Sequence, residues 1–119
     1  LSDRNVCCKA AAACLIPAEG AAEGTELPLL FAKNAEEVLV PASVSKVLTS
    51  ICMLDVVDNL CETFDYRQFD TEIGGFYGED FFPGDSMTFR EGLYAMLLPS
   101  SNVTAMAIAR NVGARLLKK

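Results

Sequence analysis

The stretch that most constrains the fold runs from Pro41 to Val57 and reads PASVSKVLTSICMLDVV. Its apolar residues recur at the i, i+3, i+4 and i+7 spacing of a helix, and others fill much of the opposite side. A helix that is apolar almost all the way round is usually buried at the centre of a domain. We therefore expect a buried helix over residues 41–58. Val44, Val47, Leu48 and Ile51 have the helical spacing, and the other side holds Cys52, Met53, Val56 and Val57.

Two polar residues, Ser43 and Lys46, stand near the start of this apolar helix. They are three positions apart, so they share one face about one turn apart. Free N–H groups and the helix dipole favour developing negative charge at Ser43. The apolar neighbours of Lys46 would disfavour its charged form, which leaves a neutral amine beside a hydroxyl as a nucleophile–base pair. Most Ser-x-x-Lys sequences instead hold a capping serine and a lysine that reaches solvent.

The bulk composition indicates one acidic, folded domain. The chain has 119 residues, of which 51% are hydrophobic and 22% charged, which is typical of a globular protein and not of a disordered one. The net charge is −6 and the basic run is limited to Lys118-Lys119, so a nucleic-acid partner is disfavoured. No apolar run reaches the roughly 18 residues that span a membrane. The segment KAAAACLIP is too short to do so, and it lacks the layout of a signal peptide.

Cysteine and histidine usage limits the chemistry. The chain has five cysteines, no C-x-x-C pair and no histidine, so no metal site and no cofactor are predicted. The odd number excludes complete internal pairing. Cys14 and Cys52 sit in apolar runs and are expected to be small core residues. Without histidine, Ser-His-Asp and Cys-His triads are excluded, so another group must take the proton from any nucleophile.

The segments before and after the apolar helix predict an α/β fold of the α+β kind. Residues 9–17 and 27–33 are interpreted as the strands of a hairpin around a glycine- and glutamate-rich loop at 18–26. Residues 60–87 are mixed. Three glycines between 74 and 78, and then Pro83-Gly84-Asp85, indicate turns at those positions rather than a regular element.

Two further helices are predicted beyond residue 87. Thr88 and Glu91 fit a capping box at the start of the first helix, and Pro99 should end it because the residue before a proline resists α geometry. The second helix ends in basic residues that suit its dipole. Its shared face would contain Met106, Ala109, Val112 and Leu116.

The break between these helices reads LLPSSN. A hydroxyl from Ser100 and an amide from Asn102 would project from this interhelical turn and could face a cleft. The simpler interpretation is that Ser101 or Asn102 caps the following helix, as serine and asparagine commonly do.

Two segments together, FAKNAEEVLVPASVSKVLTS and PGDSMTFREGLYAMLLPSSNVTAMAIA, resemble the serine-type D-alanyl-D-alanine carboxypeptidases, which are the low-molecular-weight penicillin-binding proteins. That family carries Ser-x-x-Lys after Pro-Ala, and later Ser-x-Asn before an alanine-rich helix. Both motifs occur here in that order, and the similarity extends over about residues 9–113. The resemblance implies a β-lactamase/transpeptidase-like fold, present here in part.

The resemblance also implies roles for the matched residues. Ser43 would be the acylated nucleophile, and its backbone N–H would form half of the oxyanion hole. Lys46 would take the proton from Ser43. Ser100 would relay a proton to the leaving amine, and Asn102 would bind the substrate backbone and position Lys46. The substrate would be a peptidoglycan stem peptide in the cell wall, and β-lactams would acylate the same serine.

One family motif has no counterpart in this sequence. Lys-Thr-Gly, or a close variant on an edge strand, follows Ser-x-Asn in the family but does not occur in these 119 residues. We therefore expect residues 1–119 to be the N-terminal portion of one catalytic domain: hairpin strands at 9–33, the nucleophile helix at 41–58 and part of a helical subdomain at 59–119. The chain alone would be inactive or nearly so. Its exposed apolar helix would favour self-association or pairing with the missing half.

Other functions remain open at this point. A serine β-lactamase of the same superfold would also use Ser43 and Lys46. A non-catalytic fragment or degenerate homologue would bind peptidoglycan or a partner, or would self-associate. The family acts outside the cytoplasmic membrane, so an extracytoplasmic (periplasmic or cell-surface) setting is expected.

Overall fold

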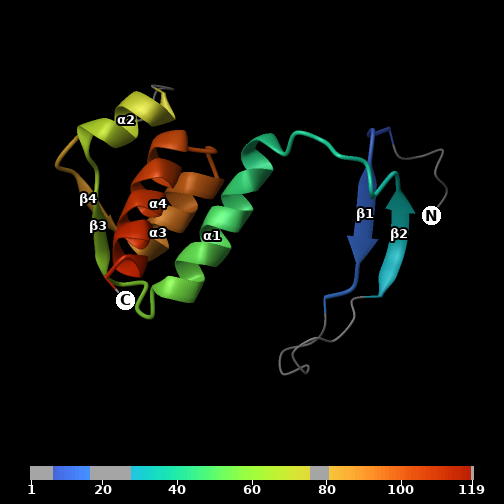
Figure 1. Cartoon of the computed structure of the whole chain (residues 1–119), viewed down its shortest axis with the longest axis horizontal. Coiled ribbons are helices and arrows are strands. Elements are labelled where there is room, and N and C mark those ends of the chain that lie inside the picture. The colour runs from blue at the N-terminus through green and yellow to red at the C-terminus, as the bar shows by residue number, and fades with distance from the viewer. Residues whose placement is uncertain (1–6, 17–27, 76–80, 119) are drawn as a thin grey trace. The chain divides into compact units, whose positions relative to one another are not determined.

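The computed structural model describes residues 7–16, 28–75 and 81–118. The chain folds as two compact units, Leu1–Val40 and Pro41–Lys119, which contain the elements drawn in Figure 1. Both small sheets are antiparallel pairs, and helices accompany one of them. The protein is therefore of the mixed α+β kind. None of the helices in the described ranges is long and apolar enough to span a membrane.

The first unit contains a β-hairpin. Strands β1 (Ala11–Cys14) and β2 (Leu29–Lys33) pair antiparallel, with an irregular register after Ala13. The hairpin predicted from residues 9–17 and 27–33 is thus present with shorter strands, and the loop expected at 18–26 lies outside the described residues. Cys14 is exposed, so its assignment to a core was wrong: a two-stranded sheet has no second layer of its own to bury it.

The second unit arranges its helices around one central helix. Figure 1 shows α4 beside α1, α2 and α3, and α4 also contacts strand β3. In chain order the elements are the 3₁₀ turn η2 (Ala42–Val44), α1 (Ser45–Val56), β3 (Thr63–Asp65), α2 (Gln68–Gly74), β4 (Ser86–Thr88), α3 (Phe89–Leu97) and α4 (Asn102–Leu116).

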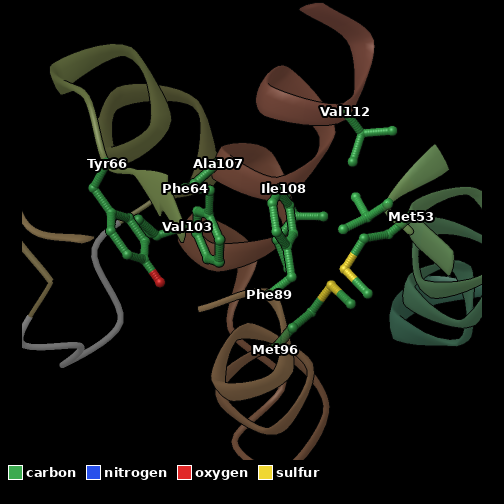
Figure 2. Packing of buried hydrophobic residues seen from close by; sticks show 10 residues of the cluster. Met53, Phe64, Tyr66, Phe89, Met96, Val103, Ala107, Ile108 and Val112 are labelled. Carbon is green, nitrogen blue, oxygen red and sulfur yellow. The ribbon is translucent and has the colours of Figure 1, made fainter. Parts of the chain in front are cut away.

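The core of this unit is aromatic at one end and rich in methionine at the other. The Phe64 ring lies 5.2 Å from Phe89 and 5.4 Å from Tyr66, centroid to centroid. Figure 2 shows these rings on one side and Met53 and Met96 on the other. Pairs of tilted rings at such distances stabilise the fold by more than their buried area alone would. The buried apolar residues are Met53, Val57, Phe64, Tyr66, Phe89, Met96, Val103, Ala107, Ile108 and Val112.

Both predicted helices after residue 87 are confirmed, and so is the capping box. The Glu91 backbone N–H donates to Thr88 Oγ1 at 3.2 Å, while the Thr88 N–H donates to Glu91 Oε2 at 2.9 Å. The buried face predicted for α4 was largely wrong. Val112 is buried as expected, but Ala109 and Leu116 are exposed, because α1, α2 and α3 surround a different stripe that includes Val103, Ala107 and Ile108.

Two other expectations about the second unit were wrong in part. The turn expected at Pro83-Gly84-Asp85 is present, but the glycines expected to mark a turn from residue 74 begin inside α2, because Gly74 is the last residue of that helix. The elements β3, α2 and β4 were not predicted. The helix over residues 41–58 was expected to be buried almost all the way round, but Val47 and Ile51 of α1 are about half exposed. Its packed side carries Lys46, Ser50 and Met53 instead. Cys52 is likewise exposed and is not a core residue.

Candidate active site

The amine of Lys46 lies at the centre of a group of three oxygen atoms. Its Nζ is 3.1 Å from Ser43 Oγ, 3.3 Å from Ser100 Oγ and 2.6 Å from Asn102 Oδ1. Lys46 is only 5% exposed, whereas Ser43, Ser100 and Asn102 reach the surface. The two segments singled out in the sequence therefore meet at one amine, although Lys46 and Asn102 are 56 positions apart.

Backbone strain marks both segments of this group. Ala42, just before Ser43, has a φ of 47°, and Ser100 has a φ of 64°. Non-glycine residues rarely adopt this left-handed region, and such outliers gather at functional sites, where the surrounding structure maintains them. Only one other non-glycine residue in the described ranges, Asn34, has a positive φ. The strain is therefore concentrated where Ser43 and Ser100 approach Lys46.

The residues that bury Lys46 differ from those that the sequence suggested. Val44, Val47 and Leu48 flank it in sequence, but each is at least half exposed and points away from the packed side. Lys46 instead lines a cavity of about 280 Å³ together with Asn102 and the end of α2. Its other lining residues are Ser45, Thr49, Ile73, Gly74, Ala105, Met106 and Ala109. Residues of α2 and α4 therefore lie beside Lys46.

A buried hydroxyl network holds the first turn of α4 beside Lys46. Ser101 is the N-cap, and its Oγ accepts from the Thr104 backbone N–H at 2.9 Å. Ser101 Oγ also donates to Thr104 Oγ1 at 2.8 Å, and the Tyr66 hydroxyl lies 2.9 Å from the same Thr104 oxygen. Of the two capping candidates, Ser101 takes the cap. Asn102 is thereby left to direct its side chain at Lys46.

An ion-pair cluster joins β3 and α2 to α4. Arg110 Nη2 is 2.7 Å from Asp70 Oδ2, and Arg110 Nη1 is 3.3 Å from Asp65 Oδ1. Asp70 is fully buried. The hydrogen bond from Arg67, and then Arg110, lowers the pKa of Asp65 to about 2 against the opposing effect of burial. The hydrogen bond and charge of Asp70, followed by those of Asp65, raise the pKa of Arg110 despite its burial.

Comparisons of the chain with protein-family models, curated proteins and solved structures gave no match. The interpretation of the site therefore depends on its geometry and on the motif resemblance. Within the described ranges, no group of three or more acidic or cysteine side chains could hold a metal ion.

The geometry allows proton transfer between Ser43 and Lys46. A neutral amine has one lone pair and two N–H groups. The lone pair would accept from the Ser43 hydroxyl, and the two N–H groups would donate to Ser100 Oγ and Asn102 Oδ1. The distances of 2.6 to 3.3 Å allow this arrangement. They equally fit an ammonium that donates to all three oxygens, which is the state after proton transfer.

Sequence reasoning found the four side chains of the group but missed the residues that support them. Tyr66 and Thr104 meet across 38 positions, and Asp70 meets Arg110 across 40. Neither pair has a local spacing that would reveal it. The one signal available was Arg110 after the apolar run AMAIA, since a charge that is buried among apolar residues needs a partner.

Proposed function

We propose that Ser43 is the nucleophile of a serine-type D-alanyl-D-alanine carboxypeptidase site acting on peptidoglycan stem peptides. The observation that supports this most directly is the convergence of Ser43, Ser100 and Asn102 on the buried amine of Lys46. A structural lysine with a capping serine would extend its amine to solvent. Here the amine is buried against three oxygens, two of them from a distant segment.

In the proposed reaction Ser43 Oγ attacks the carbonyl carbon of the bond between two D-alanines. The Ser43 proton passes to Lys46 Nζ, which lies 3.1 Å away. Ser100 gives its proton to the leaving nitrogen as the C–N bond breaks, and it takes the proton from Lys46 Nζ, 3.3 Å away, in its place. The products are free D-alanine and an acyl-serine, which water then hydrolyses. The N–H of Ser43 would stabilise the oxyanion, and Asn102 would hold both Lys46 and the substrate backbone.

The isolated chain is proposed to perform this reaction slowly. Lys-Thr-Gly, which supplies the substrate-carboxylate site and the second oxyanion donor in the family that the sequence resembles, does not occur in these 119 residues. Loss of one oxyanion donor typically reduces the rate by on the order of 10²–10³. Substrate positioning suffers as well when one wall of a cleft is missing.

A fluorescent penicillin tests the proposal, because a β-lactam traps the acyl-serine. The chain is incubated with the probe at high concentration, and the modified peptide is located by mass spectrometry. We expect slow labelling at Ser43 that disappears in Ser43→Ala and in Lys46→Ala. The matched control is Ser45→Ala, since Ser45 is an exposed serine on the same turn whose hydroxyl donates to the Ala42 carbonyl. Labelling that persists in Ser43→Ala would refute the nucleophile, and rapid labelling of the unmodified chain would refute the incomplete site.

The second candidate is a β-lactamase of the same superfold, which would use the same serine and amine. The lifetime of the adduct separates the two: a lasting acyl-enzyme favours the carboxypeptidase, and rapid turnover favours the β-lactamase. A third candidate is a non-catalytic binding fragment, for which no Ser43-dependent label is expected. For the carboxypeptidase we propose a setting outside the cytoplasmic membrane, where peptidoglycan is found.

A further inference from the structure

We infer that helix α2 packs against the first turn of α4 and thereby sets the position of Asn102 relative to Lys46. Gly74, where α2 contacts this turn, is the positioning residue. This inference rests on the proposed function for its catalytic consequence, but the positioning itself is a property of the fold. Three observations support it. The backbone of Gly74 lies close to the backbone of α4, an ion pair anchors α2 to α4, and Gly74 lines the same cavity as Lys46.

The backbone approach is at Gly74, the last residue of α2. A Cβ atom built there would lie 2.7 Å from the backbone N and Cα of Val103 and 3.0 Å from the carbonyl carbon of Asn102. These atoms belong to the first turn of α4, so they cannot rotate away as the end of a side chain could. Any side chain at residue 74 must therefore separate α2 from the turn that carries Asn102.

The anchoring comes from the ion pair between α2 and α4. Asp70 is fully buried, and Arg110 contacts it with Nε at 3.0 Å and Nη2 at 2.7 Å. A bidentate arginine–carboxylate pair fixes direction as well as distance. Asp70 also accepts from the Arg67 N–H at 2.8 Å, which completes the start of α2. Asp70 fixes the start of α2, and Gly74 at its end packs directly against the backbone of α4.

The contact point lies directly beside the candidate site. Gly74 and Ile73 line the same cavity of about 280 Å³ as Lys46 and Asn102. Asn102 is the first residue of α4 and its Oδ1 lies 2.6 Å from Lys46 Nζ, so a displacement of the first turn of α4 would change this distance. We therefore expect a substitution at Gly74 to change the surroundings of Lys46, although no residue that touches the amine is itself substituted.

Three glycine-to-alanine variants of the full chain test this inference. Gly74→Ala forces the end of α2 away from the first turn of α4. Gly92→Ala crowds the core instead, because its Cβ would lie 2.6 Å from the Phe64 ring. Gly113→Ala, in α4, meets nothing within 4 Å. The carbon–proton NMR signal of the Lys46 ε-methylene is recorded in lysine-labelled protein and assigned by its loss in Lys46→Ala. Urea unfolding measures the stability of each variant.

We expect Gly74→Ala to shift the Lys46 signal and to slow Ser43 labelling by about tenfold or more. Gly92→Ala should reduce stability but leave the Lys46 signal in place, and Gly113→Ala should change neither. If Gly74→Ala does not fold, Arg110→Lys, which removes the bidentate pair, should shift the Lys46 signal in its place. An unchanged Lys46 signal in a folded Gly74→Ala or Arg110→Lys variant would overturn the inference that α2 positions Asn102. An equal shift in Gly92→Ala would overturn it as well. The NMR result is independent of labelling, so failure of the proposed function would appear separately as an unlabelled wild type.

Discussion

Asn102 Oδ1 lies 2.6 Å from Lys46 Nζ and links the first turn of α4 to the start of α1. This bond satisfies part of the hydrogen-bonding capacity of an amine that is only 5% exposed. Because the loss of a partner leaves a buried polar group unsatisfied, Asn102→Ala should destabilise the unit by about 1–3 kcal/mol. The measurement is urea unfolding.

A double-mutant cycle separates this bond from other effects of the substitution. In a Lys46→Met background, Asn102→Ala should cost less than it does in the wild type, since the amine that it satisfied is gone. A coupling free energy below about 0.5 kcal/mol between the two positions would contradict the assigned bond.

Tyr66→Phe should destabilise the second unit by about 1 kcal/mol, the typical net value of one buried hydrogen bond. The ring contacts with Phe64 and Phe81 would remain, and the hydroxyl bond to Thr104 would be lost. Tyr94→Phe is the control, because Tyr94 is 64% exposed and its hydroxyl can be replaced by water. Equal unfolding midpoints for the two variants would argue against the Tyr66–Thr104 network.

Stability should fall in acid partly through Asp65. The hydrogen bond from Arg67, followed by Arg110, lowers its pKa from 3.8 to about 2 in the folded chain. A depressed folded-state pKa gives stability that is present above about pH 4 and lost as the pH falls toward 2. The side chain is 43% exposed, so solvent screening reduces the size of the effect.

The check is the pH dependence of urea unfolding. Asp65→Asn should flatten the stability curve between about pH 4 and pH 2, and Arg67→Gln should flatten the same part because Arg67 is the first cause of the shift. A steeper curve in either variant would contradict the assignment.

The exposed apolar side of α1 predicts concentration-dependent self-association. Val47, Leu48, Ile51 and Leu54 are each at least half exposed there, and a contiguous apolar patch of this kind favours association. In sedimentation velocity, Ile51→Lys should shift the chain toward the monomer. Leu117→Lys places the same charge at an exposed leucine outside α1 and should have little effect. A wild type that is monomeric at every concentration would contradict the prediction.

Local signals in the sequence predicted those elements that local chemistry decides. The Thr88–Glu91 capping box fixed the start of α3, and Pro99 limited its end, because both act within one turn. The strands β3 and β4 were missed because each has only three residues, too few for a period to be recognised. The seven residues of α2 lie among turn-forming glycines and aromatic residues, which mask its helical pattern.

The candidate site shows the same division. Ser43 and Lys46 are related by helix geometry, so their proximity could be predicted from spacing. The convergence of Ser100 and Asn102 on Lys46 depended on the motif resemblance, since no local rule connects residues 54 and 56 positions apart. The packed side of α1 could not be inferred either. The helix carries apolar residues on almost all of its sides, so its sequence pattern does not indicate which side faces α4.

The left-handed φ of Ala42 and Ser100 has a consequence for engineering the chain. Each residue keeps a side chain where glycine would be relaxed, at a penalty of roughly 1–2 kcal/mol. Glycine at either position would remove that strain, but it would also widen the range of conformations open to the backbone on which Ser43 and Ser100 depend. At these two positions, selection for thermal stability and selection for a rigid nucleophile should therefore favour opposite substitutions.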